Sequence, residues 1–511
     1  MNVYLWVVLA YLTILVGVAL RKSRQVKTKA DFMVAGRSVP THLLVATLVC
    51  TWIGSGSLFG GAGLAFREGV GDLWLSAGAW LGIIVVMFIA GRVRRIADYS
   101  VPELLERRYN GTARLLGTIV IMLAYLSIAA YQFRGAGWLL NRVTPLNENL
   151  TSLTGLDIPW GTILSAVTIM TFTALAGMVS IVAIDVFNGT LMITGVFVAL
   201  FLLVGKAGGW SEIASTLPPE RFEVFAGKGP LWALGVFFPT FFLLLGESSM
   251  YQKFLSAKSA VSARRAAMGM VVGVAAIEIA LALVAIVGSA IYFNQAPFFE
   301  AAADGGGMRV IKEESENVIL HLARSDLPPA AGCLLLCAAL AIIFSTGNTF
   351  LMVPSLNAGH DVYKRFLKPM ATDAEVVRVQ RIMIFVFGSL AFVLLNFFKS
   401  ILEMALMAYI MVGAGLTPAL LATFLWKRVT PQGAVASLLT GMISVLACNF
   451  LPKIFASDAW PIWIQDSEYH VYPAVILSIV ALVGVSLSTP PSPREKWAPF
   501  MSRPETEASS T

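Results

Sequence analysis

The sequence predicts an all-α protein that crosses a membrane many times. Of its 511 residues, 57% are hydrophobic and only 13% are charged, whereas about 25% of residues are charged in an average soluble protein. The apolar residues also come in blocks of about 18 or more, which is long enough for a helix to span the hydrocarbon core of a bilayer. We therefore expect a polytopic helical membrane protein.

The apolar blocks predict thirteen transmembrane helices. The first block follows only two residues and has neither a basic segment before it nor a small-residue cleavage site, which predicts a retained helix instead of a signal peptide. The expected helices cover residues 3–20, 42–66, 73–91, 113–140, 158–177, 180–205, 232–251, 267–294, 329–356, 382–398, 401–426, 433–452 and 471–489.

The positions of Lys and Arg predict the orientation in the membrane. Short cytoplasmic connections are enriched in these residues. If the N-terminus lies outside, most of the 37 Lys and Arg residues fall inside, chiefly in residues 21–41, 92–114, 252–266 and 357–381. We expect a multi-pass protein of the plasma (inner) membrane with a cytoplasmic C-terminus. This asymmetry explains the net charge of +7 without a nucleic-acid partner.

Two of the expected helices are interrupted near the middle of the membrane. Residues 51–66 read TWIGSGSLFGGAGLAF, in which 5 of 16 residues are Gly, and each Gly weakens a helix by about 1 kcal/mol relative to Ala. Residues 237–259 read FFPTFFLLLGESSMYQKFLSAKS, in which Pro239 removes a helix donor. The interruptions lie five helices apart, so the two segments cross in opposite directions, as in an inverted-repeat transporter. Glycine that only permits close helix packing is the alternative, and it explains one interruption better than two.

The helix expected at 329–356 carries four oxygen-bearing side chains within about one turn. Ser345, Asn348 and Thr349 face the same way, and Thr346 lies to one side. Such oxygens suit a hard cation, and an unwound helix nearby supplies free carbonyl groups. The alternative is that the hydroxyl groups bond to carbonyls of their own helix.

Charged residues inside the expected helices are costly and tend to mark function. They are Arg134, Asp185, Glu247 and Glu278, with Glu403 near a membrane edge. Asp185 and Glu247 adjoin polar or glycine residues, so we expect them to be buried in protein. Arg134 either pairs with Glu278 or reaches the lipid headgroups.

Several function classes find no support in the sequence. No nucleotide-binding loop of the Walker type is present, so ATP is not expected as the energy source. The four histidines lie at helix ends or in loops, so we do not expect an enzyme. A sensor built on this scaffold needs an output domain, and the Pro- and Ser-rich tail at 490–511, expected to be disordered and cytoplasmic, supplies none.

Five stretches read, in order, DFMVAGRSVPTHLLVATLVCTWIGSGSLFGGAGLAF, YSVPELLERRY, VAIDVFNG, GESSMYQKFLSAKS and STGNTFLMVPSLNAGHDVYKRF. With these stretches, in this order and at these spacings, the chain resembles the sodium/solute symporter family along almost its whole length. The resemblance implies the LeuT-type fold, whose core consists of two inverted five-helix repeats, here approximately 42–205 and 232–426. It places one extra helix before the core and two after it, in a single transmembrane domain of residues 1–489. It also implies sodium-coupled import of a small polar organic solute by alternating access.

The resemblance also implies where Na⁺, the coupling ion, binds. Some relatives bind a second sodium, and they have a serine where this chain has Asn348. Alternatively, Asp185 serves only as a way-station for sodium leaving inward. The first site would use carbonyl groups of Cys50, Ile53 and Ile342 with the hydroxyl groups of Ser345 and Thr346. The second would use Asp185, Ser345, Asn348 and Thr349.

The solute is expected at the midplane, among the interrupted helices. Sugar-transporting relatives have a glutamine, a glutamate and an asparagine where this chain has Ser57, Leu73 and Glu247, which argues against a hexose. The resemblance implies solute contacts from Gly54, Ser55, Gly56, Ser57, Trp74, Ser76, Tyr131, Gln132, Glu247, Ser248 and Ser249.

The chemistry of the solute stays open between three classes. The Glu247 carboxylate suits an amino acid or a quaternary or organic cation, with Trp74 and Tyr131 available for cation–π contact. An organic acid is the third class. Coupling to protons through Asp185 or Glu247 is the alternative to sodium coupling. The sequence predicts neither the sodium stoichiometry nor the oligomeric state.

Overall fold

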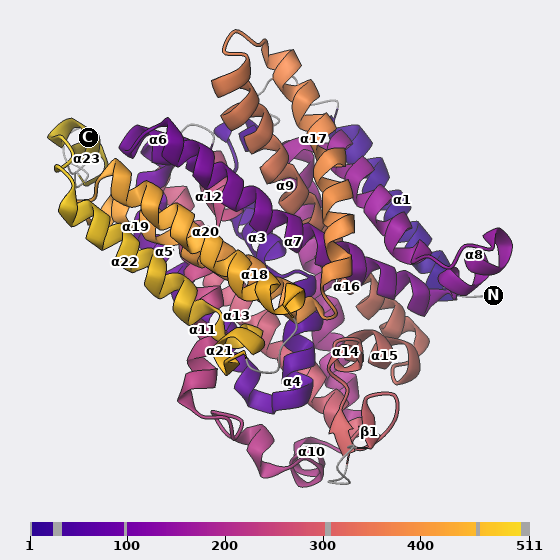
Figure 1. Cartoon of the computed structure of the whole chain (residues 1–511). Helices are drawn as coiled ribbons and strands as arrows, with labels where there is room; N and C mark the ends of the chain where they lie inside the picture. The colour runs from indigo at the N-terminus through magenta and orange to yellow at the C-terminus, as the bar shows by residue number, and fades with distance from the viewer. Residues whose placement is uncertain (1–2, 24–32, 97–99, 302–307, 456–459, 502–511) are drawn as a thin grey trace, which may run out of the picture.

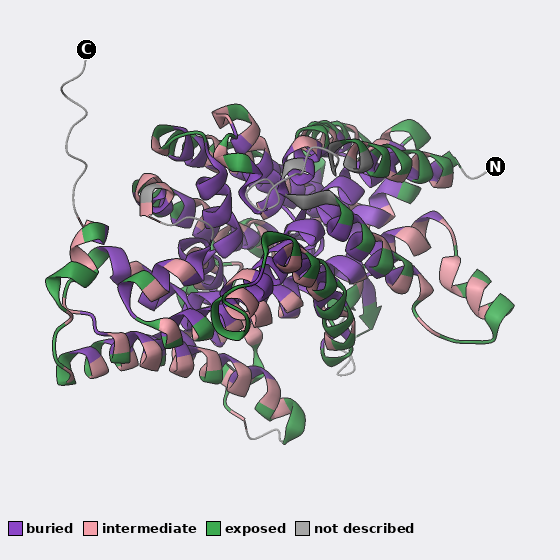
Figure 2. Ribbon diagram, turned by 90° about the horizontal axis from the view of Figure 1, so that it is seen from above, coloured by how far each residue is buried: buried purple, intermediate pink, exposed green. Residues whose placement is uncertain are grey.

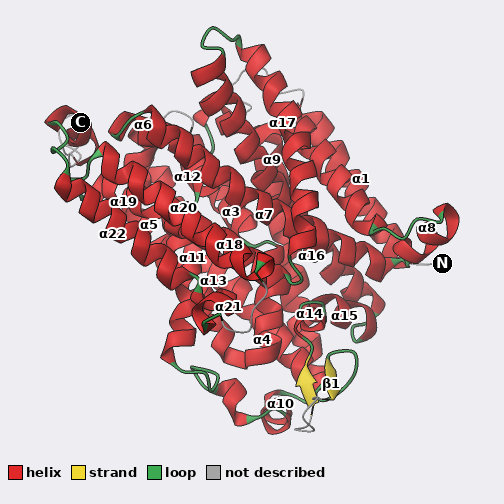
Figure 3. Cartoon of the chain, in the orientation of Figure 1, coloured by secondary structure: helices red, strands yellow, loops and turns green. Residues whose placement is uncertain are grey.

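The computed structural model describes residues 3–23, 33–96, 100–301, 308–455 and 460–501. These residues form a bundle of helices, with one antiparallel pair of short strands, β1 (Phe299–Ala301) and β2 (Met308–Val310), at one end of the molecule (Figures 1 and 3). The all-α membrane fold class is confirmed. Ten helices of the described chain are long and apolar enough to cross a membrane, and three shorter apolar helices accompany them, so the number thirteen stays a prediction.

Helices occupy all the expected spans. The longer elements are α1 (Val3–Ser23), α5 (Leu73–Ile96), α7 (Gly111–Val143), α9 (Trp160–Lys206), α13 (Ala260–Ile291), α16 (Pro329–Asn357), α17 (Asp373–Leu394), α18 (Ile401–Gly415), α20 (Pro431–Ile454) and α22 (Val471–Ser488). The shorter ones include α6 (Val101–Arg108), α8 (Leu146–Thr154), α10 (Trp210–Thr216), α14 (Lys312–Ser315), α15 (Val318–Ser325), η5 (Ala358–Leu367), α19 (Thr417–Leu425), α21 (Ile462–Gln465) and α23 (Arg494–Met501).

The region expected as two helices at 158–177 and 180–205 differs from the prediction. It is a single element, α9, of 47 residues. A helix of that length extends about 70 Å, more than twice the thickness of a hydrocarbon core of about 30 Å. No helix end marks the boundary that the sequence predicts near residue 178, because the residues there are apolar or small and include no proline.

Both predicted helix interruptions are present. The first interrupted segment runs as α3 (Thr41–Trp52), breaks at Ile53, and resumes as a π-helical turn, η2 (Gly56–Gly61), followed by α4 (Ala62–Glu68). The other runs as α11 (Pro230–Gly246), breaks at Glu247, and resumes as α12 (Ser248–Ser256). Ile53 and Gly54 leave the helix at the first break, and Glu247 alone leaves it at the second. The backbone is extended at both breaks, with ψ of 109° at Ile53 and 102° at Glu247.

The helix with the polar cluster lies in the centre of the bundle. In the most apolar stretch of the segment that includes α16, 89% of the residues are buried, whereas in that of α17 only 33% are buried. Helices α9, α7, α17, α1 and α3 pack around α16, and Figure 2 shows buried residues in the middle of the bundle and exposed ones around it. This position brings the α16 hydroxyl groups against the break after α3.

The C-terminal tail differs from the expected disorder over part of its length. Residues 494–501 form α23, and the buried ring of Phe500 lies edge-on to Phe424 of α19, with 6.0 Å between the centroids. Burial of this aromatic ring stabilises a segment that its Pro and Ser content alone did not predict to be ordered. Residues 502–511 lie outside the described part.

Candidate sodium and solute site

The break after α3 directs backbone carbonyl groups toward one hydroxyl group of α16. The Thr346 hydroxyl lies 2.8 Å from the Ile53 carbonyl oxygen, 3.2 Å from that of Cys50 and 3.4 Å from that of Thr51. The carbonyl groups are available because Ile53 leaves the helix, so the regular bonds of α3 end there. The structure thus brings together Cys50, Ile53 and Thr346, three of the five expected sodium ligands.

This cluster has more acceptors than its donor can satisfy. One hydroxyl group carries one hydrogen and cannot make good hydrogen bonds to three carbonyl oxygens at once. Several neutral oxygens that converge in a buried place, with Thr346 only 2% exposed, suit a hard cation of low charge. Ile342 lies one turn before Thr346 on α16, and Ser345 precedes Thr346 directly, with its hydroxyl directed to Asp185.

Asp185 of α9 joins three other elements of the core. One carboxylate oxygen accepts a hydrogen bond of 2.5 Å from the Ser345 hydroxyl of α16, and the other accepts one from the Thr47 hydroxyl of α3. The ammonium group of Lys253 in α12 lies 3.5 Å from that second oxygen. Asp185 is therefore already bound by two hydroxyl groups and one cation.

The other two residues of the predicted second sodium site make hydrogen bonds elsewhere. The Asn348 side-chain oxygen accepts a hydrogen bond of 2.9 Å from Thr173, and the Thr349 hydroxyl donates to the Ser345 carbonyl at 3.2 Å. The latter bond is the back-bonding to the helix's own carbonyl that the sequence left as an alternative. The structure brings together only Asp185 and Ser345 of this set.

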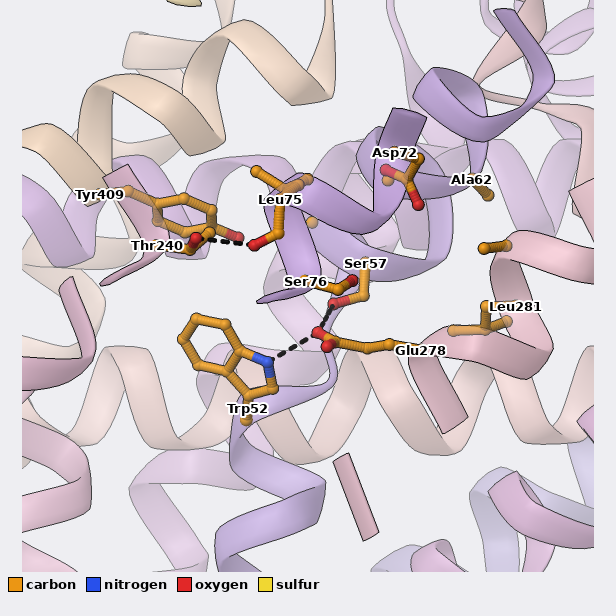
Figure 4. A pocket seen from close by; sticks show the side chains of 13 residues that line it. Trp52, Ser57, Ala62, Asp72, Leu75, Ser76, Thr240, Glu278, Leu281 and Tyr409 are labelled. Carbon is orange, nitrogen blue, oxygen red and sulfur yellow. Dashed lines mark hydrogen bonds between the residues drawn. The ribbon is translucent and has the colours of Figure 1, made fainter. Parts of the chain in front are cut away.

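A small cavity of about 20 Å³ lies on the other side of the break (Figure 4). This volume has room for about one water molecule, so a solute would need the surrounding helices to move apart. Three of its residues, Gly56, Ser57 and Ser76, belong to the expected solute site. The complete lining is Trp52, Gly56, Ser57, Gly61, Ala62, Asp72, Leu75, Ser76, Thr240, Glu278, Leu281, Ala282 and Tyr409.

The comparison with protein families decides what kind of protein carries this arrangement. The model of the sodium:solute symporter family matches residues 32–441, which include both breaks, α16 and the cavity. The chain belongs to the sodium:solute symporter family. It is a sodium-coupled symporter of small organic solutes with Na⁺ as its coupling ion, and its family consists of transporters.

Sequence relatives of the symporter cover nearly its whole length. It is 26% identical over 484 residues to the sodium/proline symporter of Haemophilus influenzae, an alignment that covers 90% of this chain and 89% of the relative. It is 24% identical over 482 residues to the high-affinity proline transporter PutP of Bacillus subtilis, covering 90% and 92% of the two chains.

Solved structures of similar fold are also sodium-coupled or LeuT-type transporters. The symporter matches the substrate-bound outward-open structure of a Na⁺-coupled sialic acid symporter with a TM-score of 0.75 at 18% identity, covering 96% of this chain and 98% of the other. It matches MhsT in complex with L-phenylalanine with a TM-score of 0.51 at 13% identity, covering 88% and 99%. At these identities the likeness concerns the fold alone, and it confirms the LeuT-type fold.

Four other expected solute residues lie at or beside the first break. They are Gly54, Ser55, Tyr131 and Gln132. The Ser55 amide and hydroxyl groups both donate to the Gln132 side-chain oxygen, at 3.0 and 2.6 Å. A side chain at Gly54 would place a Cβ 2.8 Å from both Gln132 and Thr346, so only glycine fits there. A Cβ at Gly56 would lie 3.4 Å from the hydroxyl group of Tyr131. Gln132 therefore holds the unwound segment in place.

The second break is organised differently from the prediction. The Glu247 carboxylate caps α12, accepting hydrogen bonds from the amides of Ser249 and Met250 at 3.1 and 2.8 Å, from the Ser249 hydroxyl at 2.7 Å and from Tyr125. Neither Glu247 nor its neighbour Ser248 lines the cavity. An acidic residue one position before a resumed helix is an N-cap signal that sequence reasoning passed over.

Trp74 and Arg134 also lie outside the cavity. The Trp74 ring stacks on Phe225 and donates to the Val224 carbonyl at 2.8 Å. Of the two alternatives for Arg134, the structure does not show the pairing with Glu278: the Arg134 guanidinium donates to backbone carbonyls of residues 395, 398 and 399.

Sequence reasoning missed the residues that give the cavity its charge. Glu278 was noted only as a costly intramembrane charge, and Asp72 and Tyr409 were not singled out. Trp52 lies inside the quoted glycine-rich stretch, but no pattern there predicts that its indole N–H donates to Glu278 at 2.8 Å, across 226 residues of chain. Such contacts depend on tertiary packing.

Proposed function

We propose that the symporter binds sodium between α3 and α16 and imports a small polar organic solute by alternating access. The observation that carries this proposal is the convergence of the Cys50, Thr51 and Ile53 carbonyl oxygens on the Thr346 hydroxyl. The proposed ligands are Cys50, Ile53, Ile342, Ser345 and Thr346. The proposed second site at Asp185, Ser345, Asn348 and Thr349 stays a prediction.

Sodium and solute would act on opposite sides of the same break. A sodium ion at Thr346 would bind carbonyl groups of α3 and hydroxyl groups of α16, and so fix the two helices relative to each other. Trp52, which precedes Ile53 directly, lines the cavity. A bound sodium would therefore order the residues that contact the solute, which is a physical basis for coupling.

The proposed solute classes are an amino acid, a quaternary or organic cation and an organic acid. The relatives named as proline transporters make proline the first solute to test. The expected solute residues Gly56, Ser57 and Ser76 in the cavity lining support binding next to the first break. We also propose that the protein lies in the plasma membrane with its N-terminus outside, as the distribution of Lys and Arg predicts.

Uptake into proteoliposomes tests the proposal. Purified protein would be reconstituted and given an inward sodium gradient, with potassium replacing sodium in the control, and offered labelled amino acids, betaines, amines and organic acids. We expect concentrative uptake of one class that stops when sodium is replaced. Uptake that continues without sodium and collapses when a proton gradient is removed would favour proton coupling and contradict the sodium site.

A further inference from the structure

The cavity beside the first break has two carboxyl groups and no basic side chain. Asp72, before α5, is 3% exposed, and Glu278, in the middle of α13, is 6% exposed. All thirteen lining residues belong to the described part of the chain, and none of them is Lys, Arg or His. Burial of carboxylates is costly unless a cation or hydrogen-bond donors pair with them, so this lining favours a positively charged occupant.

The two carboxyl groups differ in how far the protein satisfies them. Glu278 accepts hydrogen bonds from the indole N–H of Trp52 at 2.8 Å and from the Ser57 hydroxyl at 3.4 Å (Figure 4). It also accepts one from the indole N–H of Trp80 at 2.8 Å. The Oδ1 atom of Asp72 is buried and has no hydrogen-bond partner among the described residues. An unpartnered buried acceptor that lines a cavity indicates that a donor from a ligand completes it.

Aromatic rings form another wall of the cavity. Trp52 and Tyr409 stack with 6.2 Å between their centroids and 28° between their planes. Indole and phenol faces attract ammonium groups through cation–π contact, more strongly where water is excluded. Carboxylates together with aromatic faces bind cationic nitrogen, whereas an organic anion would meet only repulsion from Asp72 and Glu278.

Two cations of the core, Arg67 and Lys253, donate hydrogen bonds to other groups. The Arg67 guanidinium donates to the Ser315 hydroxyl at 2.6 Å, and the Lys253 ammonium binds Thr47 and Thr51 near Asp185. Neither residue lines the cavity.

We propose that Asp72 and Glu278 make this cavity selective for solutes that carry a cationic nitrogen, with that nitrogen bound between the two carboxyl groups and the Trp52 ring. The inference deepens the proposed function by assigning the solute class, and it ranks amines, quaternary ammonium compounds and amino acids above organic acids.

Equilibrium binding to the purified full-length protein in detergent and sodium tests the inference without any transport step. Thermal stabilisation would be titrated with choline and with its neutral isostere 3,3-dimethyl-1-butanol, then with proline, glycine betaine and succinate. We expect stabilisation by at least one compound with a cationic nitrogen and none by the neutral isostere or succinate. Equal stabilisation by choline and its isostere, or stabilisation by succinate alone, would overturn the proposal.

Variants of the two carboxyl groups provide the second arm. Asp72→Asn and Glu278→Gln keep side-chain size, and each is expected to weaken binding of the cationic compound at least tenfold. Glu148→Gln, at an exposed glutamate of α8, is the matched control and should leave binding unchanged. Unchanged affinity in both cavity variants would contradict the assignment. If either variant fails to fold, the comparison of choline with its neutral isostere in the unaltered protein still tests whether the cavity requires a cationic nitrogen. If binding follows this pattern but uptake does not depend on the sodium gradient, the proposed sodium coupling is refuted. The assignment of the cavity to a cationic solute would then still hold.

Discussion

The ammonium group of Lys253 lies 3.5 Å from the carboxylate of Asp185, and both side chains are almost completely buried, at 0% and 1% exposure. The same ammonium group donates to the carbonyl and hydroxyl oxygens of Thr47, both at 2.7 Å, and to the Thr51 hydroxyl. A cation of the protein thus sits among oxygens of α3 and α9, close to where a second sodium was expected. A sodium ion about 4 Å from the Lys253 ammonium group would be repelled by about 4 kcal/mol at an effective dielectric constant of about 20. Lys253 therefore disfavours a second sodium beside Asp185.

Removal of only one member of this pair should destabilise the fold. Lys253→Met leaves Asp185 buried without its cation, and breaking a buried pair in this way costs about 3–5 kcal/mol. The double variant Lys253→Met with Asp185→Asn removes both charges and should recover part of the loss. Thermal unfolding in detergent measures both, and a double variant no more stable than Lys253→Met would show that the two charges are not coupled.

The unwound segment should tolerate no side chain at Gly54. Gly54→Ala would place a Cβ 2.8 Å from Gln132 and from Thr346. Either neighbour must move, so we expect the sodium concentration for half-maximal uptake to rise about tenfold, equivalent to about 1.4 kcal/mol. The control is Gly484→Ala in α22, where a Cβ meets nothing within 4 Å. Equal sodium dependence in the two variants would contradict the close packing at the break.

Much of the fold was predictable because its signals are local. Apolar blocks define helices through their length, and Gly-rich or Pro-containing stretches weaken helices where they occur, so both breaks were found from the residues themselves. The contacts between Thr346 and the carbonyl groups of Cys50 and Ile53 followed from the family resemblance, which supplied the long-range pairing that composition does not.

The remaining features depend on pairings across the fold. Lys253 was counted among the charges of an expected cytoplasmic connection at 252–266, yet it is fully buried, because α12 extends that segment into the core. Glu247 was expected to contact the solute and instead caps α12. Asp72 and Glu278 lie 206 residues apart, and no sequence pattern predicts that they share one cavity.

A network of charges outside the expected membrane segments should make stability depend on pH. Glu106 of α6 accepts hydrogen bonds of 2.6 and 2.9 Å from Arg365 and contacts Arg114, and these partners lower the pKa of Glu106 below its ordinary value of about 4.5. A lowered pKa in the folded state contributes stability at pH above the ordinary value, and this contribution is lost as the pH falls through the lowered value.

Glu106→Gln tests this contribution. At pH 7 the variant should be less stable than the unaltered protein by about 1 kcal/mol or less, because the group is partly exposed to solvent. The difference should shrink as the pH falls below about 4. Thermal unfolding at a series of pH values measures it, with Glu148→Gln as the control. A difference that stays constant down to pH 3 would mean that the carboxylate charge is not its source.

The sodium dependence of uptake in Thr346 variants tests the central claim most directly. Labelled solute uptake into proteoliposomes would be measured against sodium concentration for the unaltered protein, Thr346→Ser and Thr346→Ala. We predict that Thr346→Ser, which keeps the hydroxyl oxygen, stays within about threefold of the original half-maximal sodium concentration, and that Thr346→Ala raises this concentration about tenfold or more. The same sodium dependence in all three proteins would contradict a sodium site at the break between α3 and α16.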